Sequence, residues 1–271
     1  MPSHSLITHD RLARLIGTPD CPVLVDICID EDFAEDPRLV PGAFRHPFQR
    51  IEDLAPRLAG RETVVICQKG LKLSDGAAAL LRSTGLAARK LQGGMIGWRD
   101  AGLPLIPAAA LPARRPDGRT LWVTPERPGV DPIACVWLIR RFADPGARIL
   151  FVDPAEAALI AVKFDARPFA IAEASTSRPA GFSGFAGMLG AFRLETGPLL
   201  RLAALVSAAG QGGHPQVPEA AGLRAAIDGF SRIHGDDHAL TDAALALLDA
   251  YYARVRDEAV DGPSGQPVTV A

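Results

Sequence analysis

Short apolar runs alternate with helical stretches along the first hundred residues, and this alternation constrains the fold more than any other feature. The runs PVLVDI (Pro22–Ile27) and ETVVIC (Glu62–Cys67) are typical of strands buried in a parallel sheet. A helical stretch with Ser74 as its N-cap follows the second run and ends at Gly85. Strands that alternate with helices predict an α/β fold, with a mainly parallel sheet flanked by helices.

A chain of 271 residues is long enough for two domains. The best candidate boundary is Leu103–Arg119, which holds four prolines. We therefore expect one domain over residues 1–106, a Pro-rich linker over 107–119 and a second domain over 120–258. The second domain begins as α/β and becomes mostly helical. Residues 259–271 are expected to form a disordered tail.

Composition excludes several classes of partner. The formal net charge is −2, so no global basic field is present to bind nucleic acid or an anionic membrane. No apolar run reaches the roughly 20 residues that a membrane-spanning helix needs. The N-terminal segment also lacks the design of a signal peptide. We expect a cytoplasmic protein without a membrane or nucleic-acid partner, and its oligomeric state cannot be read from the sequence.

Cys67 lies at the end of a predicted strand, just before the loop that leads into a helix. Ligands of open α/β sheets bind at this carboxyl edge. Backbone N–H groups of the following loop and of the helix start favour negative charge there. Lys69 and Lys72 add positive charge, and Gly70 permits the loop to curl. The arrangement suits an anionic sulfur or a bound oxyanion above Cys67, and a buried structural cysteine is the alternative.

Several motifs of the first domain point to a known family. The loop CQKGLKLS resembles the active-site loop Cys-x-x-Gly-x-Arg of the rhodanese sulfurtransferases. The segment LQGGMIGWRDAGLPL (Leu91–Leu105) resembles the closing segment of that family. VLVDI and VPGA (Val40–Ala43) resemble two further motifs, so the resemblance covers roughly residues 5–106. It implies a rhodanese-like domain.

The resemblance also implies a mechanism. The Cys67 thiolate would take a sulfane sulfur from a small-molecule donor such as thiosulfate, and a thiophilic acceptor would remove it from the persulfide. Asp26 would support the site, and no cofactor is expected. The loop that would cradle the persulfide and bind the donor consists of Gln68, Lys69, Gly70, Leu71, Lys72 and Leu73.

The loop departs from the family in ways that bear on its chemistry. Lys72 stands where the family has arginine, which keeps the charge and loses the bidentate fork. Cys28 stands where the family has arginine after Asp26. A cysteine phosphatase of related fold would need arginine six positions after the cysteine, and Leu73 occupies that position. The sequence therefore favours sulfur transfer over phosphatase chemistry.

The second domain resembles another family. The run from Trp122 to Pro154, which contains IACVWLIRRFADP, resembles the C-terminal domain of the chromate-resistance protein B family, as does HGDDHAL further on. This resemblance covers roughly residues 120–256. Arg140, or Arg127 in the preceding loop, could contact an oxyanion such as chromate. A helix-end cation in a salt bridge is the alternative role for Arg140.

His234 and His238 are four residues apart, so both could face one side of a helix. Asp236 or Asp237 could complete a metal site, or could instead cap that helix. The His and Cys set that the resembled family carries in mid-domain is missing, and His214 is the one imidazole there. We therefore predict that no metal is bound. His234 and His238 are the candidate ligands if one is.

Two functions remain open. The chain could be a rhodanese-type sulfurtransferase with an accessory domain linked to chromate resistance. It could instead be a non-enzymatic chromate-response sensor or oxyanion-binding protein that uses the rhodanese fold as a thiol module. A sensor needs only an accessible thiol. A sulfurtransferase also needs the anion cradle, whose Gly70 and two lysines are present here.

Overall fold

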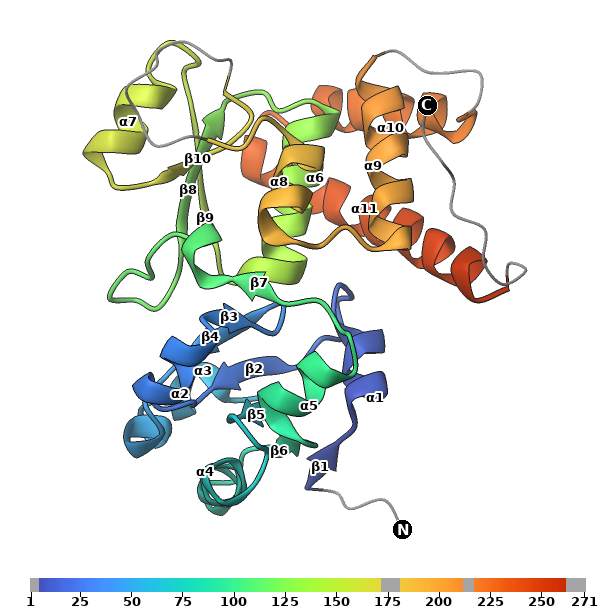
Figure 1. Cartoon of the computed structure of the whole chain (residues 1–271). Coiled ribbons are helices and arrows are strands. Elements are labelled where there is room, and N and C mark those ends of the chain that lie inside the picture. The colour runs from blue at the N-terminus through green and yellow to red at the C-terminus, as the bar shows by residue number, and fades with distance from the viewer. Residues whose placement is uncertain (1–4, 172–180, 212–216, 262–271) are drawn as a thin grey trace.

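A five-stranded, entirely parallel sheet forms the centre of the N-terminal unit (Figure 1). The computed structural model describes residues 5–171, 181–211 and 217–261. The strand order is β1-β6-β5-β2-β4, which confirms the α/β prediction with a parallel sheet. The strands are β1 (Leu6–Ile7), β2 (Val23–Asp26), β4 (Ala43–Arg45), β5 (Thr63–Ile66) and β6 (Ala88–Leu91).

Alternate strand residues face two different apolar clusters. Val64 and Ile66 point to one face of the sheet, and Val65 points to the other with Ala78 and Leu81. The two clusters are covered by separate sets of helices, so the sheet is buried on both sides. The helical segments are α1 (His9–Leu15), α2 (Asp30–Glu35), η1 (Phe48–Leu54), α3 (Ala55–Leu58), α4 (Lys72–Ser83) and α5 (Gly94–Asp100).

Helix α4 begins three residues earlier than the sequence predicts. Its N-cap is Leu71, and Ser74 lies inside the first turn. The Ser74 hydroxyl donates to the carbonyl of Leu71 over 3.2 Å, so it does not cap the helix from outside. The prediction of a Ser74 cap was wrong because this side chain bonds the preceding loop instead.

Part of the expected linker is regular structure. Strand β7 (Ile106–Pro107) pairs antiparallel with β3 (Arg38–Leu39), and a 3₁₀ turn, η2 (Ala108–Ala110), follows. Ile106 is buried in the main apolar cluster, which holds this stretch against the N-terminal unit. The irregular part of the expected linker, 107–119, is therefore shorter than predicted.

The C-terminal unit contains a three-stranded parallel sheet and a group of helices (Figure 1). The sheet order is β10-β8-β9, and the later part of the chain is helical, as predicted. The strands are β8 (Leu121–Pro125), β9 (Arg148–Val152) and β10 (Arg167–Pro168). The helices are α6 (Val130–Leu138), the π-helical η3 (Ile139–Ala143), α7 (Ala157–Lys163), α8 (Phe185–Phe192), α9 (Gly197–Gly210), α10 (Glu219–Ile233) and α11 (Asp237–Asp261).

Helix α11 extends into the expected tail. It continues to Asp261, so residues 259–261 are helical and do not belong to a tail. The remainder of the expected tail, 262–271, lies outside the described residues, as does His214. Among the described helices, none is long and apolar enough to cross a membrane.

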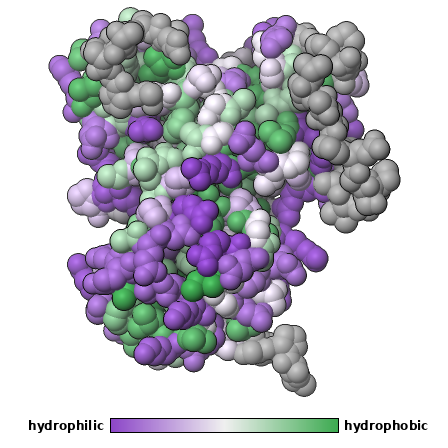
Figure 2. All heavy atoms as spheres, viewed as in Figure 1, coloured by the Kyte–Doolittle hydropathy of each residue, from purple (hydrophilic) through white to green (hydrophobic). Residues whose placement is uncertain are grey.

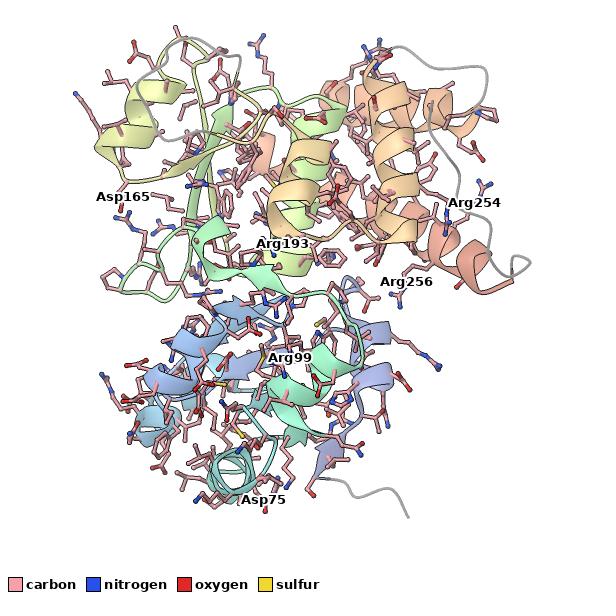
Figure 3. All side chains as sticks on the ribbon, viewed as in Figure 1. Asp75, Arg99, Asp165, Arg193, Arg254 and Arg256 are labelled. Atoms are coloured by element: carbon pink, nitrogen blue, oxygen red, sulfur yellow. The ribbon has the colours of Figure 1, made fainter. Side chains whose placement is uncertain are left out.

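The two units share one apolar core. The main cluster contains Ile16 and Ile106 from the first unit together with Phe142 and Tyr252 from the second. Gly17 has a φ of +83°, and a Cβ there would overlap Phe142. At the same junction, where Figure 3 labels Arg256, its guanidinium donates to the carbonyl of Arg14 over 2.8 Å. The units are therefore packed together and not strung on a flexible connector.

Candidate active site

Cys67 directly follows β5, at the carboxyl edge of the parallel sheet. Its side chain is 4% exposed. The thiol donates to the Ser74 hydroxyl oxygen over 3.2 Å, and this is the polar contact of the sulfur in the described structure. The Ser74 hydroxyl has a single proton, which it gives to the Leu71 carbonyl, so it can donate to a Cys67 thiolate only by releasing that carbonyl. The pair places one hydroxyl beside the sulfur that the sequence singled out.

The loop after Cys67 is held by the start of α5. The amides of Met95 and Ile96 donate to the carbonyls of Cys67 and Gln68, each over 3.0 Å. Gly70 has a φ of +67°, and a Cβ there would lie 2.6 Å from the Gly94 nitrogen. A Cβ on Gly94, whose φ is +59°, would overlap the Cys67 carbonyl oxygen. The two glycine-containing motifs thus meet, backbone against backbone.

The hydrogen bonds from the Met95 and Ile96 amides orient the amides of the loop. A peptide's N–H points opposite to its C=O. Because the Cys67 and Gln68 carbonyls point to α5, the following two amides point away from it. Among the described residues, no backbone carbonyl accepts from the amides of Gln68, Lys69, Gly70 or Leu71. The loop therefore presents free donors next to the first turn of α4, a combination that favours an anion.

Lys69, Leu71 and Lys72 are exposed, whereas Leu73 is partly buried against the core. No carboxylate of the described residues pairs with either lysine. The ammonium groups are therefore available to an anion that approaches the loop. Of the six predicted cradle residues, Leu73 is the one whose side chain points mainly into the core.

Asp26 supports the neighbouring strand end. It is fully buried, and its Oδ1 accepts from the Cys28 amide over 2.8 Å. Burial raises the pKa of the Asp26 carboxyl, and the bond from Cys28 opposes that rise. Burial and the nearby Asp26 raise the pKa of the Cys28 thiol. Cys28 is therefore held as a neutral thiol in this environment.

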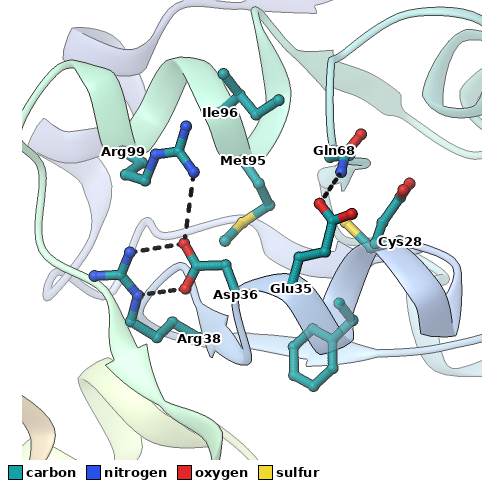
Figure 4. A pocket seen from close by; sticks show the side chains of 10 residues that line it. Cys28, Glu35, Asp36, Arg38, Gln68, Met95, Ile96 and Arg99 are labelled. Carbon is teal, nitrogen blue, oxygen red and sulfur yellow. Dashed lines mark hydrogen bonds and ion pairs between the residues drawn. The ribbon is translucent and has the colours of Figure 1, made fainter.

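A pocket of about 340 Å³ opens beside the loop (Figure 4). Cys28 and Gln68 form one side, α5 contributes Met95 and Arg99, and the other wall comes from α2 and the residues after it. Gln68 donates to Glu35 over 3.5 Å across its mouth. The surface of the N-terminal unit in this view is mostly hydrophilic (Figure 2).

The charged wall of this pocket was missed by sequence reasoning. Asp36 accepts two hydrogen bonds from Arg38, over 2.5 and 2.7 Å, and Arg99 lies 3.9 Å from it. The Arg38 guanidinium lowers the pKa of the Asp36 carboxyl. The available signal was the acidic run DEDFAED, residues 30–36, which the prediction left unused.

The proposed oxyanion contacts of the second unit are tied to α11. Arg140 forms an ion pair with Asp242. The Arg127 backbone, with φ at +53°, donates its N–H to Asp237 over 3.0 Å. Next to them, Arg141 makes a bidentate pair with Asp249, which also accepts from Trp137. The salt-bridge role is thus observed for Arg140.

His234 and His238 do not share a helix face, which corrects the expected geometry. Helix α11 begins at Asp237, so His234 lies before it. The His238 ring packs edge-on to Phe151, with centroids 5.0 Å apart. Asp236 accepts from the Ala239 amide over 2.8 Å, which is the capping role. No group of three potential metal ligands occurs among the described residues.

Two further cysteines lie away from the loop. Cys135 is fully buried in α6, and burial raises the pKa of its thiol well above the usual value. Burial likewise raises the pKa of Cys21 to about 12. Both are free thiols that the protein keeps neutral, so Cys67 is distinguished from them by its loop.

Comparison with known proteins bears first on the C-terminal unit. Residues 122–255 match the family model described as "ChrB, C-terminal domain". The chain is also 34% identical over 149 residues to "Protein ChrB" of Cupriavidus metallidurans. That alignment covers 54% of this chain and 44% of the relative, so the chain spans less than half the length of the relative it matches. The resemblance of the second unit to this family is confirmed.

Solved structures resemble the N-terminal part. A thiosulfate sulfurtransferase from Pseudomonas aeruginosa is 28% identical over 37% of this chain and 19% of its own, with a TM-score of 0.33. A rhodanese-like domain protein from Staphylococcus aureus is 27% identical over 35% of this chain and 90% of its own, with a TM-score of 0.31. These scores are too low to carry a conclusion. The description of the N-terminal unit as rhodanese-like therefore depends on its own sheet order, its loop after Cys67 and its closing segment.

Proposed function

We propose that the chain is a rhodanese-type sulfurtransferase that moves a sulfane sulfur through a persulfide on Cys67. The observation that carries this proposal is the loop clamped at the edge of the sheet. Its thiol lies beside Ser74, its amides lack carbonyl partners and its two lysines lack carboxylate partners, within the described residues. A buried structural cysteine needs none of these features.

The reaction has two half-reactions. The Cys67 thiolate attacks the outer sulfur of a donor such as thiosulfate, a new S–S bond forms, and sulfite leaves with the electron pair of the broken bond. A thiophilic acceptor then attacks the terminal sulfur, and the Cys67 thiolate leaves. The added sulfur carries the negative charge, which the loop amides and the start of α4 stabilise.

The charged groups at the loop suit an anionic donor. Lys69 and Lys72 are exposed at the loop, so they can attract thiosulfate without first breaking an ion pair. The pocket of about 340 Å³ reaches Gln68 and offers room for an acceptor next to the persulfide. We assign the C-terminal unit an accessory role linked to chromate resistance, on the basis of its family match.

Intact-mass measurement tests this function. Wild-type protein incubated with thiosulfate should gain the mass of one sulfur atom, and added cyanide should remove it. Cys67→Ser should show no gain and should retain its fold, because serine keeps the size and polarity of the side chain. The matched control is Cys21→Ser, a partly buried cysteine away from the loop, which should load and discharge like wild type.

The non-enzymatic alternative makes the opposite prediction. A thiol module for sensing would leave Cys67 titratable and free of any sulfur adduct after thiosulfate treatment. Loading that persists in Cys67→Ser would also contradict the proposal, since the persulfide would then be elsewhere.

A further inference from the structure

A second cavity lies between the two units, away from Cys67. Its volume is about 200 Å³. Leu24, Phe44, Arg57 and Arg61 line it from the N-terminal unit. Val23 and Leu24 begin β2, and Arg61 precedes β5, so this cavity lies toward the amino ends of the strands. The proposed sulfur-transfer loop is at the opposite end of the same strands.

The other wall comes from the C-terminal unit. Arg119, Asp144 and Gly146 line the cavity from that side. The loop that bears Arg119 precedes β8 and lies above β4 and α3 in Figure 1. Arg114 from this loop places its guanidinium over the ring of Phe44, 5.1 Å from the centroid. The cavity is thus assembled only when both units are in contact.

The carboxylate of the cavity is already neutralised. One oxygen of Asp144 accepts from the Thr120 amide over 2.7 Å and from its hydroxyl over 2.8 Å, and lies 3.1 Å from Arg114. The other oxygen accepts from the Gly146 amide over 3.0 Å. Asp144 therefore has little capacity left to balance further positive charge.

Three arginines at the cavity form no ion pair with a described residue. Within the described part of the chain, no carboxylate lies at ion-pair distance from Arg57, Arg61 or Arg119. Arg57 also lies over Phe44, at 5.1 Å from the ring centroid. Partial burial and the neighbouring Arg114 and Arg119 guanidinium groups lower the pKa of Arg57, and the carboxylates of Asp144 and Asp117 oppose part of that shift. Like charges gathered in this way repel each other, and a bound anion would relieve the repulsion.

We propose that this cavity binds one small dianionic oxyanion of the sulfate class, held by Arg57, Arg61 and Arg119. Guanidinium groups present paired donors that match the oxygens of such an anion. All three arginines are solvent-exposed, so an ion can reach them from outside. Because the arginines come from both units, the ion would also bridge the units. The site uses neither Arg127 nor Arg140, and it stands whether or not Cys67 carries sulfur.

Isothermal titration with sodium sulfate tests the proposal, in chloride buffer of constant ionic strength. Wild-type protein should bind sulfate saturably at the cavity. Arg61→Ala and Arg119→Ala should each weaken this binding at least tenfold, while circular dichroism and melting temperature in chloride stay close to wild type. The matched control is Arg232→Ala, an exposed arginine of α10, which should bind as wild type does.

A further variant separates this site from the Cys67 loop. Lys72→Ala should leave sulfate binding at the cavity unchanged. Sulfate binding that is lost in Lys72→Ala and kept in the arginine variants would overturn the proposal and place the anion at the loop. The absence of saturable sulfate binding to wild type would overturn it as well. Binding of a DNA duplex without sulfate binding would instead indicate a polyanion surface.

Discussion

The carboxyl ends of β5 and β8 occupy equivalent positions in their sheets, but the loops that follow them make different contacts. Each is a central parallel strand followed by a short loop and a helix. After β5 the loop is open beside a pocket of about 340 Å³. After β8 the loop is exposed but is tied to the start of α11, since the Arg127 amide donates to Asp237, and the ring of His238 packs on Phe151 nearby.

This difference shows that sheet topology alone does not decide whether a strand end forms a binding site. The rule that ligands bind at the carboxyl edge of a parallel sheet applies to both strands. What distinguishes them is the element to which the following loop is bonded. The loop after Cys67 is supported from one side by α5, which leaves its amides free. The loop after Pro125 is bonded by a helix that begins more than 100 residues later.

Gly94→Ala should have the largest effect, because it breaks the support of the open loop. The φ of +59° disfavours any side chain, and the new Cβ would overlap the Cys67 carbonyl oxygen. We expect a loss of about 3 kcal/mol in the free energy of unfolding, from left-handed strain plus overpacking. Sulfur loading should fall at least tenfold. Chemical denaturation and the thiosulfate mass assay measure the two effects.

Gly60→Ala is the matched control for that variant. Gly60 has a φ of +72°, and a Cβ there would meet nothing within 4 Å. It should therefore lose only the conformational part, about 1 kcal/mol, and keep wild-type loading. Equal losses of unfolding free energy and of sulfur loading in the two variants would show that the contact between Gly94 and the loop contributes to neither.

The sequence predicted the open loop after Cys67 better than the tied loop after Pro125, for a physical reason. Cys67, Gly70 and the lysines are close in sequence, and their roles follow from local strand-to-helix geometry. The hydrogen bond that ties down the Arg127 loop comes from α11, and no local pattern indicates such a distant contact. The contact of Ser74 with the Cys67 thiol was missed although both residues lie in one local segment, because a serine before a helical stretch indicates a cap first.

Asp237→Ala tests the tied loop after β8. It removes the acceptor of the Arg127 amide and an acidic residue from the first turn of α11. Both losses destabilise, and together they should cost about 1 kcal/mol of unfolding free energy. Sulfur loading at Cys67 should remain within twofold of wild type. Glu126→Ala, at an exposed neighbouring position, should leave both quantities unchanged, and a loss of loading in Asp237→Ala would contradict the separation of the two edges.

Asp26→Asn tests the buried carboxyl group at the end of β2, the strand next to the one that carries the open loop. Burial raises the pKa of Asp26, so the folded state binds this proton more tightly than the unfolded chain. Its favourable contribution is complete below the unfolded pKa of 3.8 and is lost as the pH rises through the folded pKa. Asparagine keeps the acceptor for the Cys28 amide. The variant should match or exceed wild-type stability at pH 7 and show a flatter stability profile above pH 4, measured by urea denaturation.

Lys72→Ala should have the smallest effect, and it addresses the charge at the open loop. Lys72 is exposed in the first turn of α4 and has no carboxylate partner among the described residues, so its loss should barely change stability. A screened surface charge contributes less than about 1 kcal/mol to the binding of a dianion. We therefore expect the KM for thiosulfate to rise about threefold to fivefold, with little change in kcat. Lys72→Arg should restore the wild-type KM, because the charge returns. A KM that stays unchanged in Lys72→Ala would remove this side chain from donor binding and leave the loop amides as the source of anion affinity.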